Sequence, residues 1–581
     1  MSYPGTSVPV LHVGTDRYLL CDSAIIAEAS ELVWTVNPPI AVDTVMWPDQ
    51  EWENLSLSYF SLLDDDGLLR MWYGAYEGLP VQRRICYAES VDGLNWVKPS
   101  LGLVEHGGSF DNNILPITVS DGGYVFVDPL AAPSSKYKFL GTGPFPMLFE
   151  SPDGLEWTLV DSALLDLVPD SHNLVFYDNQ IGSYVAYLRS WNMIEEYDSL
   201  AQPWRTVSRL EIADVASFWD YTPIDSPFYR WGPGKPPAIS NEFDVIMAPD
   251  TLDPPEMDIY NPSVVRYEDA ANAYFAFPSI YHHYPPPPVG EFNNDGVLNI
   301  QLGYSRDGIT WSRYRTEYLD NDCFGDSLRQ IYLAPSIIRM GNSLYQYFNG
   351  LEESHGDSVK TSHYFCVKQR VDGFLSLRAS SSPAFLRTVP LTFEGNSLNL
   401  NYAVNPGGYV AVGLFDPGGN PLPGFGFDDC DTLRGDKISG PVSWSGIRNI
   451  EIYEGTQLSM GLEMREAELF AFQFKLDPSL DVSSGPLLAR SWSLEQNYPN
   501  PFNPSTMIEF ALPRRVAVKM TVYNVLGQEV RTLVDGPLSA GQHKVAWDGV
   551  DSHGTGVAGG VYFYRLVADD FSETRKMVLL R

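Results

Sequence analysis

The feature that most constrains this chain is a turn motif that returns at regular spacing. The aspartates Asp92, Asp153 and Asp214 are evenly spaced, and Asp307 follows after a longer gap. Even spacing of a β-turn motif predicts a radial repeat in which each unit is one small sheet. The motif reads Ser-x-Asp-Gly-x-x-Trp in three complete copies, with one degenerate copy: Ser90–Trp96, Ser151–Trp157, Ser305–Trp311 and Asp214–Trp219.

The chemistry of this turn is local and structural. An aspartate accepts hydrogen bonds from backbone amides two residues further along, a serine does the same more weakly, and the glycine supplies a positive φ. We expect the tryptophan to pack between adjacent sheets. The motif therefore indicates the blades of a propeller rather than an active site.

Short alternating segments rich in aromatic residues lie between these turns. Aromatic residues make up 13% of the chain, and 48 Gly with 44 Pro supply many turns, which favours an all-β fold. Most of these segments follow a hairpin turn that contains Gly or Asn, and we count five blades over about Asp16–Cys366. The segments are Leu68–Tyr73 with Arg84–Ala88, Tyr137–Leu140, Ser183–Leu188, Ala273–Phe277 and Ser343–Phe348.

The pattern changes near Asp372 to short alternating strands with a turn-rich loop, which is typical of a β-sandwich. The sequence thus predicts an all-β chain with a five-bladed β-propeller, a β-sandwich accessory domain and a small immunoglobulin-like β-sandwich. The expected boundaries are 1–371 for the propeller, 372–476 for the accessory domain, 477–492 for a Ser/Asp/Pro-rich linker and 493–581 for the last domain.

Charge and cysteine usage exclude several classes. With 38 basic and 73 acidic residues the formal charge is −35, and nucleic acid is not an expected partner because phosphate binding needs a basic face. The five cysteines form no Cys-x-x-Cys pair, so neither a zinc site nor a disulfide framework is expected. We expect no metal and no cofactor.

Membrane and export signals are scarce at the N-terminus. No apolar run reaches the length of a transmembrane segment. Met1–Val13 has neither the basic nor the apolar region of a signal peptide, which we interpret as a start that is truncated or removed.

The last segment nevertheless carries a specific set of motifs. These are Tyr498–Pro504, Val522–Gln528, Gly559–Phe563 and Thr574–Val578. Together they resemble the type IX secretion sorting domain, which has an FlgD-type immunoglobulin-like fold. The resemblance covers Ser493–Arg581. It implies the type IX secretion machinery as a partner, and a secreted or cell-surface location in a Gram-negative-type bacterium.

The front part resembles the five-bladed β-propeller glycosidases of glycoside hydrolase families 32 and 43. The resemblance is carried by the repeated turns and by Trp47–Glu53 and Met257–Pro262. Two family motifs, Asn-Asp-Pro-Asn-Gly in the first blade and Arg-Asp-Pro, are missing from this chain. It therefore resembles an outlying branch, and the family's catalytic residues have no counterparts that can be carried over.

Candidate site residues follow from propeller geometry, because the residue before each innermost strand faces the central funnel. Glycoside cleavage needs one protonated carboxyl group and one carboxylate, and crowding of acids in a funnel separates their pKa values. We expect Glu53, Asp170 and Asp258 to be catalytic. We expect substrate binding from Trp52, Asn113, His172, Arg189, Tyr260, His282 and His355.

Three functions are compatible with these features. The first is a secreted or cell-surface glycoside hydrolase acting on poly- or oligosaccharides. The alternative is a glycan-binding surface protein without catalysis, which would keep the aromatic residues and lose the acid pair. A sialidase would need an arginine triad and a nucleophilic tyrosine, and arginines are scarce at the predicted funnel positions.

Overall fold

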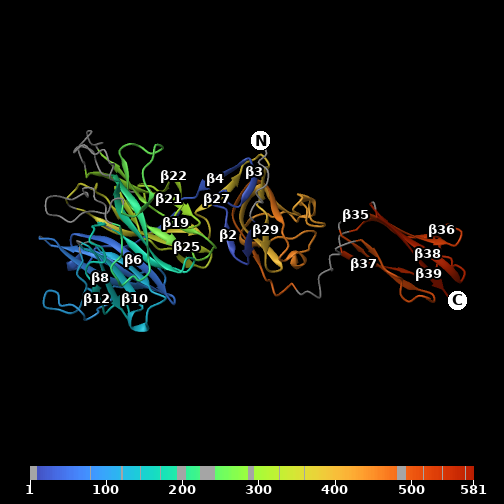
Figure 1. The fold of residues 1–581 in the computed structure, drawn as a ribbon, viewed down its shortest axis with the longest axis horizontal. Coiled ribbons are helices and arrows are strands. Elements are labelled where there is room, and N and C mark those ends of the chain that lie inside the picture. Colours follow the sequence, from blue (N-terminus) through green and yellow to red (C-terminus); the bar gives the residue numbers. More distant parts are fainter. Residues whose placement is uncertain are drawn as a thin grey trace. The chain divides into compact units, whose positions relative to one another are not determined.

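The computed structural model shows an all-β chain (Figure 1). Its packing divides into two compact units, Thr35–Ser376 and a second unit formed by Met1–Trp34 with Leu377–Arg581. Among the described residues, helix is limited to short 3-10 turns, and no helix is long and apolar enough to span a membrane. The described residues are 10–78, 80–119, 122–143, 145–170, 172–192, 204–222, 242–284, 294–325, 328–358, 360–480, 492–513, 516–538, 541–569 and 571–580.

The unit Thr35–Ser376 is the five-bladed propeller, built from five mainly antiparallel sheets. Blade 1 is β6 (Ser56–Asp65), β7 (Leu68–Glu77) and β8 (Gln82–Ser90). Blade 2 is β9 (Gly123–Val127), β10 (Tyr137–Thr142), β11 (Pro146–Ser151) and β12 (Thr158–Asp161). Blade 3 is β13 (Leu174–Asp178), β14 (Ser183–Asn192), β15 (Trp204–Ile212) and β16 (Asp244–Met247).

Blades 4 and 5 contain more strand segments than the other blades because some of their strands are interrupted. Blade 4 is β17 (Met257–Asn261), β18 (Val264–Arg266), β19 (Tyr274–Ala276), β20 (Ser279–His283), β21 (Gly296–Ser305) and β22 (Ser312–Leu319). Blade 5 is β23 (Gln330–Leu333), β24 (Ile338–Met340), β25 (Ser343–Leu351) and β26 (Ser362–Arg370), joined by β5 (Ile40–Met46).

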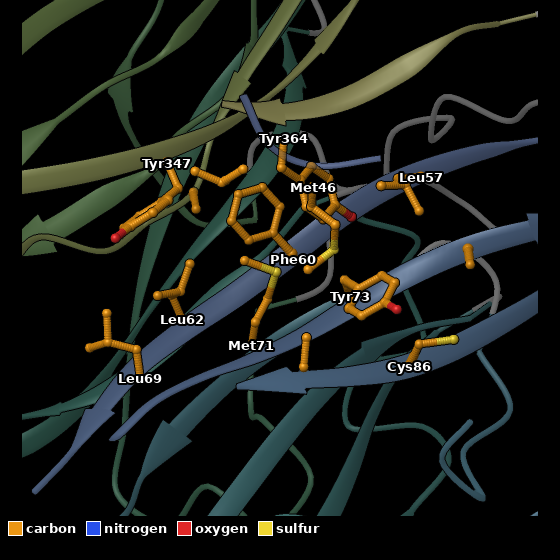
Figure 2. Close-up of a cluster of buried hydrophobic side chains, with 14 of the residues drawn as sticks. Met46, Leu57, Phe60, Leu62, Leu69, Met71, Tyr73, Cys86, Tyr347 and Tyr364 are labelled. Atoms are coloured by element: carbon orange, nitrogen blue, oxygen red, sulfur yellow. The ribbon is translucent and has the colours of Figure 1, made fainter. Parts of the chain in front are cut away.

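The strand β5 closes the ring. It precedes blade 1 in the sequence but pairs antiparallel with β26, the last long strand of blade 5. Figure 2 shows the core behind this closure, where Met46 of β5 and Phe60 and Met71 of blade 1 lie near Tyr347 and Tyr364 of blade 5. Burial of this shared apolar surface holds the two ends of the propeller together.

A hydrogen bond between neighbouring blades recurs around the ring. In each case a tyrosine on the second or third strand of one blade donates to an aspartate at the end of the first strand of the blade before. The pairs are Tyr137–Asp65 at 2.6 Å, Tyr184–Asp128 at 2.7 Å and Tyr274–Asp178 at 2.5 Å. Each bond satisfies a phenol that packs between sheets.

The repeated turns have the expected chemistry. At Asp153, one carboxylate oxygen accepts the amides of Leu155 and Glu156, and the Ser151 hydroxyl accepts the amide of Gly154. Gly154 has φ +77°, and a Cβ there would lie 2.8 Å from the Trp72 ring of blade 1. The prediction of a structural turn wedged between blades is therefore confirmed.

The described residues 10–34 belong to the accessory sandwich, which differs from the expected propeller boundary at residue 1. The strands β2 (Arg17–Leu19) and β3 (Ile26–Ser30) pair with β32 and β28, and β1 (Leu11–Gly14) pairs with β29. The reason is that these residues complete ladders whose other strands lie far along the sequence. Those strands are β28 (Ala384–Thr388), β29 (Leu391–Phe393), β30 (Ser397–Phe415), β31 (Asp436–Pro441) and β32 (Ser459–Lys475).

The boundaries between the two units fall within β4 (Leu32–Val36) and β27 (Leu375–Ala379). The expected linker 477–492 lies mostly outside the described residues, which omit 481–491.

The C-terminal domain, red in Figure 1, is a small sandwich of two sheets. Its buried core includes Phe510, Trp547 and Tyr564. One sheet is β33 (Ser493–Leu494), β34 (Thr506–Leu512) and β37 (Gly541–Trp547), and the other is β35 (Val516–Asn524), β36 (Glu529–Leu538), β38 (Gly560–Ala568) and β39 (Phe571–Leu579). This is the immunoglobulin-like fold that the sequence predicts.

Candidate functional site

A cavity of about 170 Å³ opens at the hub of the propeller. It is lined by residues from blades 1, 4 and 5 and from the loop before blade 3. A concave, polar and aromatic pocket on a propeller axis is a common place for ligand binding. The lining residues are Ser56, Leu57, Ser58, Tyr59, Tyr76, Asp170, Tyr260, Gln330, Tyr332, Asn349, Leu351, His355 and Lys360.

Two of the tyrosines belong to irregular positions in the innermost strands. The register of β6 shifts between Leu57 and Phe60, where Tyr59 lies. The register of β17 shifts between Ile259 and Asn261, where Tyr260 lies. A β-bulge re-aims the side chains of its strand, and both tyrosines line the cavity.

The rings around the cavity support one another. Tyr59 stacks on His172 with centroids 4.9 Å apart and an angle of 6°, and it meets Tyr332 edge-on at 5.4 Å. Tyr332 and Tyr260 lie 5.6 Å apart. Burial lowers the pKa of His172 to about 4, so this ring is neutral at physiological pH.

Asp170 is the one carboxylate among the described residues that line the cavity. Its backbone has φ +60°, and its side chain, 28% exposed, forms an ion pair with Arg189. The Arg189 guanidinium is fully buried, donates through Nε to the Tyr260 carbonyl at 2.6 Å and covers the Tyr260 ring at 4.0 Å. Although burial alone would lower it, Asp170 and Tyr260 raise the pKa of Arg189, which stays charged.

Tyr260 and His355 form a hydrogen-bonded pair on the cavity wall. The Tyr260 hydroxyl lies 2.9 Å from His355 Nε2, and His355 Nδ1 lies 3.2 Å from the Asn294 carbonyl oxygen. The His355 amide donates to the Gly296 carbonyl, which holds this loop of blade 5 against blade 4. Lys360 Nζ donates to the His355 carbonyl at 3.0 Å.

Asp258 lies behind this wall rather than in the funnel, which differs from the expectation. Its side chain is 0% exposed. One oxygen accepts from Arg205 Nη1 at 2.9 Å and lies 3.4 Å from His283 Nε2. Burial alone would raise the pKa of Asp258, but Arg205 and His283 outweigh it and hold the pKa below its usual value.

Glu53 also lies away from the cavity. It is 0% exposed and closes the short 3-10 turn η1 (Glu51–Glu53). Its carboxylate accepts the amides of Asp49 and Gln50, the Tyr73 hydroxyl at 2.6 Å and Lys98 Nζ at 2.7 Å. All of its acceptor capacity is used inside blade 1, because the turn folds the side chain back under its own backbone.

Some of the expected substrate-binding residues lie at the hub cavity, and the others lie elsewhere. Tyr260 and His355 line the cavity, Arg189 and His172 support its walls, and these four come together with Asp170. The others do not reach it. Trp52 donates to Asn113 at 3.0 Å, and Asn113 donates to the Tyr73 hydroxyl, so both belong to the Glu53 network. His282 lies on β20 outside the cavity lining.

Several lining residues were not anticipated from the sequence, chiefly Tyr59, Tyr332, Lys360 and the supporting Arg205. Tyr59 and Tyr332 lie on innermost strands, and their alternation with buried neighbours was an available signal. Lys360 comes from a loop that no pattern places at the hub. Within the part of the chain that is described, no group of three or more His, Cys, Asp or Glu side chains is arranged to hold a metal ion.

Comparison with known proteins gives different matches for different parts of the chain. A family model described as the FlgD Ig-like domain matches residues 503–570. Uncharacterised proteins of two Mycobacterium tuberculosis strains are 32% identical over 146 residues, which is 24% of this chain. The chain spans 44% of the length of these curated relatives.

Solved structures of glycoside hydrolase type are similar at low identity. A putative glycoside hydrolase of Bacteroides ovatus matches with 14% identity and a TM-score of 0.38, over 57% of this chain and 97% of that one. The α-L-arabinofuranosidase PaAbf62A of Podospora anserina matches with 9% identity and a TM-score of 0.33, over 62% and 99%. The C-terminal domain is thus an FlgD Ig-like domain. The assignment of the propeller depends on the strand pairing observed in this chain.

Proposed function

We propose that this chain is an exported carbohydrate-binding protein that holds a saccharide in the hub cavity of its propeller. The observation that carries the proposal is the cavity wall itself. Tyr59, Tyr260 and Tyr332 provide aromatic surface, and Asp170, Gln330 and Lys360 provide polar side chains on the same wall. Aromatic rings beside a few convergent polar groups suit the faces and hydroxyls of a sugar.

The test is binding of the full chain to a panel of neutral and acidic oligosaccharides by calorimetry. Tyr332→Ala should weaken binding about 10-fold, in line with the ~0.5–1.5 kcal/mol of an aromatic contact. Tyr345→Ala is the matched control, because Tyr345 lies on β25 of the same blade and outside the cavity lining. No binding to any member of the panel, or equal affinity for the Tyr332 variant, would contradict the proposal.

Glycoside hydrolysis is a second candidate, favoured by the Asp170 carboxylate on the cavity wall. A hydrolase needs a second carboxyl group about 5–9.5 Å away. Among the described lining residues Asp170 has no such partner, since Glu53 and Asp258 are fully buried. Release of reducing sugar by the wild-type chain, and loss of that release in Asp170→Asn, would favour the hydrolase.

We also propose that the C-terminal domain is a type IX sorting domain and that the propeller acts outside the cell. The match of residues 503–570 to the FlgD Ig-like domain supports this, together with the Tyr498–Pro504 motif. In a host with type IX secretion, the full chain should reach the medium or the cell surface with the domain removed. A variant truncated before Ser493 should stay inside, and equal export of both forms would exclude the sorting role.

A further inference from the structure

The hub cavity presents a phenol, an imidazole and an ammonium group, those of Tyr260, His355 and Lys360, and Asp170 is the one carboxylate among its described lining residues. We propose that the cavity takes a uronate, a sugar whose ring carries a carboxylate, and that Tyr260 and His355 cleave its glycosidic bond by β-elimination. This inference rests on the saccharide binding proposed above and adds to it the substrate class and the reaction.

The hydrogen bonds of His355 fix where its proton lies. A carbonyl oxygen only accepts, so Nδ1, 3.2 Å from the Asn294 carbonyl, carries the proton. Nε2 therefore has a free lone pair and accepts from the Tyr260 hydroxyl at 2.9 Å. The pair thus places a base and an acid side by side in the cavity, joined by one proton.

The cations around this pair favour an anionic ligand. Among the described residues, no carboxylate lies within ion-pair distance of Lys360, whose Nζ donates to the His355 carbonyl. Asp357, Glu353 and Asp295 act on Lys360 only from longer range. On the Arg189 guanidinium, Nη2 is buried without a hydrogen-bond partner among the described residues, while Nη1 pairs with Asp170.

These donors are unusual in a chain with 73 acidic and 38 basic residues. Lys360 is a partly buried cation on the cavity wall without a close counter-ion among the described residues, and a ligand carboxylate would offset the cost of burying it. A neutral sugar would leave Lys360 without an anion, whereas Arg189 already has Asp170. The charge arrangement therefore points to an acidic sugar rather than a neutral one.

The same charges couple the pKa of His355 to the binding of an anionic ligand. Burial, with Lys360, Arg205 and Arg189 nearby, lowers the pKa of His355 to about 3. The imidazole is therefore neutral at physiological pH. An arriving carboxylate counteracts the neighbouring cations and raises the pKa of His355, because an anion favours the protonated form. The substrate itself then restores the basicity that proton abstraction needs.

The reaction balances without a co-reactant. As the substrate binds, the Tyr260 hydroxyl turns to the glycosidic oxygen, which frees the lone pair of His355 Nε2. Nε2 then takes the proton from the carbon next to the carboxylate, while Lys360 stabilises the charge that develops on that carboxylate. The C–H electrons form a carbon–carbon double bond, and the neighbouring C–O bond to the leaving sugar breaks. The Tyr260 hydroxyl gives its proton to the leaving oxygen. The proton on His355 then passes to Tyr260 along their hydrogen bond, which restores the pair.

The experiment incubates the full chain with polygalacturonate, alginate, hyaluronan and chondroitin, with mannan and arabinan as neutral probes. Product formation is followed by the ultraviolet absorbance of unsaturated uronate, and separately by reducing ends. At least one uronate polymer should give unsaturated product, and neither neutral polymer should. Binding of each polymer is measured by calorimetry.

Three variants test the roles. Tyr260→Phe and His355→Gln should each lower kcat by about 100-fold or more, the usual contribution of general acid–base catalysis, with KM changed little. Lys360→Met should mainly raise KM for the uronate polymer. Tyr345→Phe and Lys368→Met are matched controls, because Tyr345 lies on β25 outside the cavity and Lys368 is exposed on β26. Thermal unfolding identifies any variant that fails to fold, and the two remaining variants then test the proposal.

The outcomes separate this inference from the function on which it rests. Binding of uronate polymers without unsaturated product overturns the elimination and leaves saccharide binding intact. Reducing ends without unsaturation indicate hydrolysis and also overturn it, as does full activity of Tyr260→Phe. Absence of binding to every polymer rejects the proposed function and the inference together.

Discussion

The Glu53 network in blade 1 and the hub cavity both pair an acid with a buried cation, yet they differ in what they leave accessible. Glu53 is fully buried and bonded to Lys98 and Tyr73, and Tyr73 is bonded in turn to Asn113. At the hub, by contrast, Asp170 pairs with Arg189 but stays 28% exposed on the wall of a cavity. A carboxylate near a propeller axis is therefore not enough to mark a site, and an accessible one on a cavity wall is the better indicator.

The largest effect should come from removing the Glu53 carboxylate. Glu53→Ala leaves Lys98, whose side chain is only 11% exposed, without its buried partner. Breaking such a pair should lower the free energy of unfolding by about 3–5 kcal/mol. Urea denaturation measures this loss, and saccharide affinity of the folded fraction should stay within about twofold of wild type.

The matched control is Glu150→Ala. Glu150 pairs with Lys138 at 2.9 Å but is more exposed, so its loss should cost no more than ~1 kcal/mol. If Glu53→Ala were as stable as Glu150→Ala and abolished binding, Glu53 would belong to the binding site and not to a structural network.

The next effect concerns binding rather than folding. Asp170→Asn keeps a side chain that tolerates the positive φ but removes the charge beside Arg189. Saccharide affinity should fall about 10- to 100-fold, which corresponds to the ~1.5–3 kcal/mol of a hydrogen bond to a charged group. Asp372→Asn, at another positive φ in the propeller, is the control and should bind as wild type does. Equal affinity of both variants would remove Asp170 from the site.

The last effect is a pH dependence located at the hub. The folded-state pKa of His172 is about 4 and the unfolded value is 6.5, so the unfolded chain alone binds the proton between these values. Stability should therefore fall as pH drops from 6.5 towards 4, by about 1.4 kcal/mol per pH unit from this residue.

The variant His172→Phe keeps a ring to stack on Tyr59 and should remove the share of the slope that His172 contributes, with unfolding followed by tryptophan fluorescence. The share of His355, whose pKa is also lowered by burial, should remain. His553→Phe, an exposed position in the C-terminal domain, should leave the slope unchanged. A slope that persists in full without His172 would show that the ring is not buried at the hub.

Much of the fold was predictable because its signals are local. The Ser-x-Asp-Gly-x-x-Trp turns define blade edges through bonds between residues only two or three positions apart. The site was less predictable. Asp170, Tyr260 and His355 were anticipated at the hub, but Glu53 and Asp258 were expected there too and lie in the core. No sequence pattern distinguishes an acid that packs in the core from one that reaches the cavity.

By itself, then, the sequence determined the repeat, the strand alternation and the motifs of the C-terminal domain, all of which depend on neighbouring residues. The tertiary structure alone decided that β5 closes the ring with β26, and that bulges turn Tyr59 and Tyr260 towards the cavity. It also decided that Tyr260 meets His355, 95 positions further along. These features depend on which distant groups share one small volume, and burial and hydrogen-bond saturation exist only once the chain has folded.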